Sequence, residues 1–78
     1  MRRLGKVLQV TKSASLIVQT DKTPPLGAKV VDKKAQRVGK IQDVFGPVKN
    51  PYISIRFHSK SSEEAGKLLG QMVYLYQK

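Results

Sequence analysis

Six short segments rich in β-branched and aliphatic residues, separated by turn-forming residues, restrict this chain to a small β-structure. Strands of this length at fairly regular spacing are typical of an all-β barrel or sandwich. Residues 61–69 are the helical candidate, because Ser61 and Glu64 have capping-box spacing, and Gly66 and Gly70 limit the helix to one or two turns. The expected strands are residues 4–10, 15–19, 29–32, 37–45, 51–57 and 71–76.

Two of these strands carry further detail. Residues 51–57, "PYISIRF", alternate cleanly and place Ile53, Ile55 and Phe57 on one face, which we expect to be the core face. In residues 37–45, Gly39 stands where a barrel strand often bends or where another backbone comes close.

The size of the chain limits how much it can stabilise itself. With 78 residues and no cysteine, it has room for one domain, residues 1–78, and no disulfide to support it. A domain of this size buries only roughly 60% of its unfolded surface. Closing the sheet would remove unpaired edges, and a permanent partner would stabilise the folded state.

Charge is the strongest compositional signal. Fifteen Lys and Arg against five Asp and Glu give a net charge of +10, most of it in residues 1–40. Such a field favours polyanions, although Lys and Arg also simply solubilise small domains. We expect four basic residues to lie near RNA: Lys33, Lys34, Arg37 and Lys49. Tyr52, Tyr74 and Tyr76 share outward parity and could form a platform for bases or for a protein partner.

Catalytic groups are sparse. His58 stands alone at a strand end, and Asp21, Asp32 and Asp43 sit beside turn signals, where aspartate makes local hydrogen bonds. One histidine and no cysteine leave little to bind a transition metal. We therefore expect no enzymatic activity, no metal and no cofactor.

The loop "DVFGPVKNPY", residues 43–52, is unusually apolar for a connection between strands. Gly46 followed by Pro47, and Asn50 followed by Pro51, form two rigid bends that preorganise it. A preorganised apolar loop loses less entropy on binding, which favours a durable protein interface. The alternative is that Phe45 and Val48 simply cap one end of the core, and the residues alone leave both interpretations open.

The segment "VVDKKAQRVGKIQDVFGPVKNPYISIRF", residues 30–57, resembles the core domain of the Gar family, the glycine–arginine-rich-domain proteins of H/ACA ribonucleoproteins. The resemblance extends to "LGKVLQV", "SLIVQT" and "GQMVYLY". Its specific part is "DVFGPV", then two residues, then "PY". The portion "VVDKKAQRVGKIQDV" is shared with PRC-barrel and ribosome-maturation proteins.

The resemblance implies a six-stranded β-barrel with no activity of its own. Together with the helical candidate at residues 61–69, the expected fold is a small six-stranded barrel with one short helix before the last strand. The resemblance also implies direct binding to the catalytic domain of a dyskerin-type pseudouridine synthase, with guide and substrate RNA contacted mostly indirectly, and help in substrate loading and product release. The implied interface centres on Val44, Phe45, Gly46, Pro47, Val48, Pro51 and Tyr52.

Arg-Gly-Gly tails, which eukaryotic members carry, do not flank the domain, so the resemblance is to an archaeal form that acts as a monomer within a hetero-complex. Without a run of about 18 apolar residues, we expect a cytoplasmic protein. The charge keeps a second interpretation open, an autonomous RNA- or ribosome-binding barrel.

Overall fold

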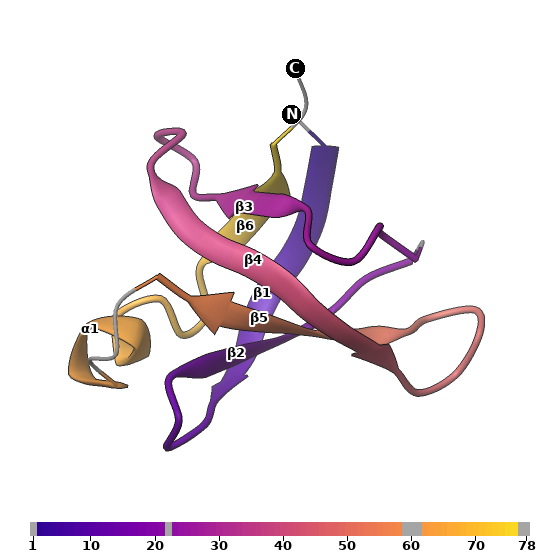
Figure 1. The fold of residues 1–78 in the computed structure, drawn as a ribbon, viewed down its shortest axis with the longest axis horizontal. Helices are drawn as coiled ribbons and strands as arrows, with labels where there is room; N and C mark the ends of the chain where they lie inside the picture. The colour runs from indigo at the N-terminus through magenta and orange to yellow at the C-terminus, as the bar shows by residue number, and fades with distance from the viewer. Residues whose placement is uncertain (1, 22, 59–61, 77–78) are drawn as a thin grey trace.

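The computed structural model describes residues 2–21, 23–58 and 62–76 and shows a closed antiparallel β-barrel. Around the barrel the strands follow the order β1-β2-β5-β4-β3-β6 (Figure 1). Because the sheet closes on itself, the fold is the expected barrel and not a sandwich. The elements are β1 (Arg2–Val10), β2 (Ser15–Gln19), β3 (Lys29–Val31), β4 (Arg37–Phe45), β5 (Tyr52–Phe57), α1 (Ser62–Gly66) and β6 (Met72–Leu75).

Every strand begins and ends within two residues of its expected position. The helix is confirmed but shorter than residues 61–69, because Gly66 ends it and Gly70 adopts a φ of +80° in the turn that follows. The expected cap, Ser61, lies outside the described residues. Among these residues, no helix is long and apolar enough to cross a membrane.

The barrel interior is filled by inward-facing aliphatic side chains from all six strands. Burying one such side chain contributes about 1.5–3 kcal/mol. On β5 the expected core face is confirmed, since Ile53 and Ile55 are fully buried and Phe57 is 9% exposed. Helix α1 lies against β1 and β2 and buries Ala65 completely. The other fully buried aliphatic residues are Val7, Leu16, Val18, Val30, Ile41 and Val73.

The turn between β3 and β4 forms as its sequence predicts. One carboxylate oxygen of Asp32 accepts hydrogen bonds from the backbone N–H groups of Lys34 and Gln36, each at 2.9 Å. These bonds hold the chain through Ala35, whose φ of +63° lies in the left-handed region. Asp32 is therefore a turn residue.

A β-bulge in β4 changes which side chains face outward near the end of that strand. The pairing of β4 with β5 shifts register between Ile41 and Asp43. Strict alternation would place Phe45 inside with Ile41, whereas an extra residue reverses the parity beyond it. Val44 accordingly packs against the core, and Phe45 is exposed.

Gly39 confirms the expected close approach of two backbones. A Cβ atom at this position would overlap the backbone carbonyl of Arg56 on the neighbouring strand β5. The backbones of β4 and β5 can thus come this close because residue 39 has no side chain.

We expect Gly39→Ala to lower the free energy of unfolding by about 1–3 kcal/mol, because strands β4 and β5 must separate to admit the methyl group. The measurement is the denaturation midpoint in urea. Gly66→Ala is the matched control, since a Cβ at that helical position meets nothing within 4 Å. It should leave stability unchanged or raise it by up to about 1 kcal/mol. Equal losses in the two variants would contradict the proposed contact.

Candidate partner-binding surface

The loop that joins β4 to β5 projects from the barrel on the side away from α1 (Figure 1). At its base Phe45 and Tyr52 are directly paired across the two strands, and their rings stack with centroids 5.8 Å apart at an angle of 22°. Phe45 is nevertheless 45% exposed, and Val48 at the tip is 93% exposed. Neither side chain belongs to the core cluster, so the idea that they cap the barrel is wrong.

Gly46 allows the loop to turn directly over the Tyr52 ring. Its φ is +92°, and a Cβ atom there would lie 2.8 Å from Cδ2 of Tyr52. Both the backbone conformation and the space therefore require glycine. The stacked pair and the bend depend on each other.

The base of the loop is held by β2. The backbone N–H of Thr20 donates to the carbonyl oxygen of Pro51 at 2.9 Å, and the Gln19 side-chain amide reaches the Asn50 carbonyl at 3.4 Å. Pro51 is buried and Val44 is half-buried. These two residues of the expected interface support the loop from within, and the accessible part consists of Phe45, Gly46, Pro47, Val48 and the half-buried Tyr52.

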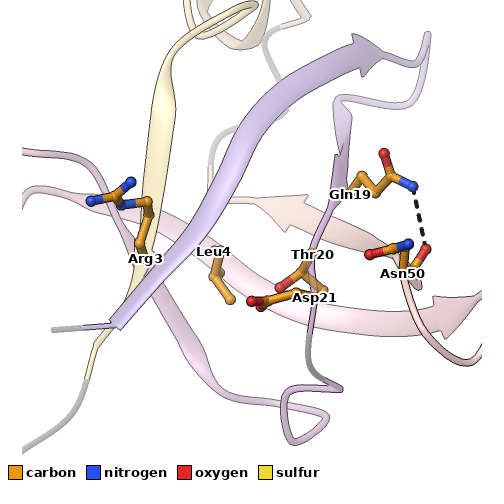
Figure 2. A pocket seen from close by; sticks show the side chains of 6 residues that line it. All are labelled: Arg3, Leu4, Gln19, Thr20, Asp21 and Asn50. Carbon is orange, nitrogen blue, oxygen red and sulfur yellow. Dashed lines mark hydrogen bonds between the residues drawn. The ribbon is translucent and has the colours of Figure 1, made fainter.

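An open polar groove lies beside this loop, between the start of β1 and the end of β2 (Figure 2). Thr20 is only 4% exposed in this groove, and its hydroxyl has no hydrogen-bond partner within the described part of the chain. An unpaired buried hydroxyl is costly, typically by about 1–3 kcal/mol. The lining residues are Arg3, Leu4, Gln19, Thr20, Asp21 and Asn50.

The four basic residues expected near RNA do not form one patch. Lys33 and Lys34 lie in the turn before β4, and Arg37 begins that strand. Lys49 lies in the loop after its other end. Nine residues of extended strand separate these ends by about 26 Å. The first three residues are neighbours, and Lys49 belongs to the apolar loop.

The predicted tyrosine platform is wrong. Tyr52 lies on β5 and Tyr74 on β6, and these strands are on opposite sides of the barrel, each separated from the other by two strands in either direction. The sequence correctly predicts that all three rings lie on the outside of the barrel. Which of the rings are close to one another depends on the order of the strands, which the sequence does not give.

The candidate catalytic residues are engaged in local structure. The backbone N–H of His58 donates to the carbonyl oxygen of Val38, and Nδ1 of its ring lies 3.0 Å from the same oxygen. Asp43 accepts a hydrogen bond from the next backbone N–H in the chain. Across residues 2–21, 23–58 and 62–76, no three His, Asp or Glu side chains come together as a metal site would need.

The model of the family described as "Gar1/Naf1 RNA binding region" matches residues 1–78. The chain belongs to the Gar1/Naf1 family. This confirms the resemblance found in the sequence, including the barrel that the family implies.

Relatives agree with this assignment. An uncharacterized protein of Methanothermobacter thermautotrophicus is 36% identical over 76 residues, which make up 96% of this chain and 83% of that protein. The mouse (Mus musculus) H/ACA ribonucleoprotein complex non-core subunit NAF1 is 33% identical over 67 residues. Those residues are 83% of this chain but 14% of the mouse protein, so the chain spans a small part of that relative.

The Gar1 domain of Naf1 is also known as a solved structure. It matches with a TM-score of 0.79 and 18% sequence identity, over 97% of this chain and 81% of that one. At this identity the likeness shows the fold alone: the two chains share the same barrel.

One further group of basic residues becomes visible only in the folded Gar1/Naf1 domain. Lys29, Lys40 and Arg56 lie side by side on three adjacent strands, because Lys29 pairs with Lys40 and Lys40 pairs with Arg56. Alternation along residues 51–57 predicts only that Arg56 faces outward. The alignment of the three residues depends on register between strands, which the sequence does not state.

We expect Phe45→Ala to cost only about 1 kcal/mol of unfolding free energy, because the ring is partly exposed and loses mainly its stacking on Tyr52. Leu16→Ala, in the fully buried interior, should cost about 2–5 kcal/mol. Chemical denaturation of both variants checks this. A loss for Phe45→Ala as large as that for Leu16→Ala would mean that Phe45 is a core residue.

Proposed function

We propose that this chain is a non-catalytic accessory subunit of an H/ACA ribonucleoprotein that isomerises guide-selected uridines during ribosome biogenesis. Membership of the Gar1/Naf1 family supports this role, and one relative is named as a non-core subunit of that complex. The observation that carries the proposal is the loop at residues 44–52, an apolar, preorganised surface displayed by a chain that belongs to this family.

The direct partner is a dyskerin-type pseudouridine synthase, bound through the accessible part of this loop. Its residues have the properties of an interface anchor: two stacked aromatic rings and a fully displayed aliphatic side chain on a backbone held by glycine and proline. Aromatic residues dominate the binding energy of protein interfaces, and a rigid loop avoids the entropy cost of ordering on contact.

The polar groove beside the loop suits the edge of the same interface. The side-chain amides of Gln19 and Asn50 line it and offer hydrogen bonds next to the loop (Figure 2). The apolar tip then supplies affinity, and the groove supplies orientation.

Such a subunit assists catalysis by acting on the synthase. A ligand shifts a conformational equilibrium only by binding one state more tightly than another. By holding the RNA-gripping loop of the synthase in one of its positions, the barrel promotes loading of substrate RNA and release of product. It supplies no reacting group of its own.

Titration calorimetry of the chain into a purified dyskerin-type synthase tests this function. Phe45→Ala and Tyr52→Ala should each weaken binding by about 2 kcal/mol or more, equivalent to about 30-fold in Kd. Multiple-turnover pseudouridine formation should slow in parallel.

Leu69→Ala is the matched control. Leu69 is 54% exposed, similar to Phe45, but it follows α1 on the side of the barrel away from the loop. Wild-type affinity and turnover for Phe45→Ala and Tyr52→Ala would rule out the loop as the synthase contact. Equal losses for Leu69→Ala would place the contact elsewhere on the barrel.

A further inference from the structure

A row of basic side chains crosses the outer face of three adjacent strands. Lys29 on β3 is directly opposite Lys40 on β4, which is in turn opposite Arg56 on β5. All three are exposed. With strands about 4.8 Å apart, the row spans about 10 Å. We call Lys29, Lys40 and Arg56 the basic row.

The basic row is unfavourable for the barrel alone. Like charges directly opposite each other on neighbouring strands destabilise a sheet. The carboxylate of Asp32, in the turn between β3 and β4, is engaged by backbone N–H groups. The arrangement is one that a polyanion would neutralise.

Two adjoining hollows make the row part of a groove. One is lined by Lys29, Arg37, Lys40 and Tyr76, and the next by Arg37, Lys40, Arg56 and His58. The shared residues Arg37 and Lys40 join them. Cationic groups therefore line the outer surface continuously from β3 to β5.

Tyr76 adds an aromatic ring at one end of this groove. It is 43% exposed, and its backbone N–H donates to the carbonyl oxygen of Lys29 at 2.9 Å, which places it beside the basic row. Grooves that bind single-stranded nucleic acid combine cations along the backbone with aromatic side chains on which bases stack. Phosphate and base thus each have a matching group here.

We propose that the groove formed by Tyr76 and the basic row binds single-stranded RNA, with the row on successive phosphates and the Tyr76 ring stacked on a base. An acidic protein surface would also match the cations. The exposed Tyr76 ring beside them favours RNA, because grooves for single strands combine cations with aromatic rings. The site is separate from the loop at residues 44–52, because Lys40 and Phe45 are five residues apart on β4, about 16 Å. The inference does not rest on synthase binding.

The test measures binding of a single-stranded oligouridylate of about 10 nucleotides to the full chain at several salt concentrations. Each phosphate neutralised on a single strand contributes about −0.7 to the slope of log K against log[salt]. Lys29→Gln/Lys40→Gln should therefore bind more weakly, with a slope less steep by about 1.4.

The matched control is Lys6→Gln/Lys12→Gln, which removes the same charge from exposed positions on β1 and in the turn after it. Strand β1 lies across the barrel from β4. The control should keep nearly the wild-type affinity and slope. Thermal unfolding at low salt separates binding from folding, because relieving repulsion in the row should leave the melting temperature equal or higher.

Tyr76 is tested independently of charge. Tyr76→Ala should weaken binding about fivefold or more with an unchanged salt slope, whereas Tyr76→Phe should retain affinity because the ring remains.

Three results would overturn the inference. The first is no salt-dependent binding of the oligouridylate by the wild type. The second is an equal loss in the two double variants, which would mean a diffuse charge effect. The third is tighter binding of a polyglutamate peptide that depends on the basic row, with Tyr76→Ala silent, which would indicate an acidic protein partner. None of these results bears on the synthase titration, so the two proposals fail separately.

Discussion

The pairing of β4 with β5 is the constraint on which both candidate surfaces depend. One register places Ile41 opposite Ile55 inside the barrel, Lys40 opposite Arg56 outside it, and Phe45 opposite Tyr52 at the loop. The bulge after Ile41 makes these compatible, since without it Phe45 would face the core. Toward the start of β4, Gly39 has no side chain, and this allows the backbones of β4 and β5 to lie close together. Core, groove and loop are thus consequences of a single strand pairing.

Local features of the fold could be predicted because their causes are local. Strand ends follow from glycine, proline and aspartate, and the core face of β5 follows from alternation, both of which act over a few residues. The β4 bulge and the opposite placement of Tyr52 and Tyr74 could not be predicted in this way. They depend on which strands become neighbours and in what register, and those contacts are non-local in sequence.

The two candidate sites also differ in how far the sequence predicts them. The loop is a contiguous stretch, so its composition and its resemblance to a family are enough to mark it as a candidate interface. Even there, burial of Pro51 and half-burial of Val44 come from contacts with β2 and the core, which the stretch itself does not encode. The basic row is assembled from three strands, and Lys29 and Arg56 are 27 positions apart in sequence. A sequence motif made of neighbouring residues therefore cannot predict that Lys29 and Arg56 belong to one site.

A barrel of 78 residues has little stability to spare, yet this one places three like charges directly opposite one another on neighbouring strands. Under the RNA-binding proposal, phosphates would neutralise the row. Ligands that bind only the folded state stabilise it by mass action, so binding would offset the cost of the repulsion. The two surfaces also share one strand pair. Lys40 and Phe45 both lie on β4 and both pair with β5, on either side of the bulge, so RNA bound at the groove and a synthase bound at the loop would occupy separate positions along the same two strands.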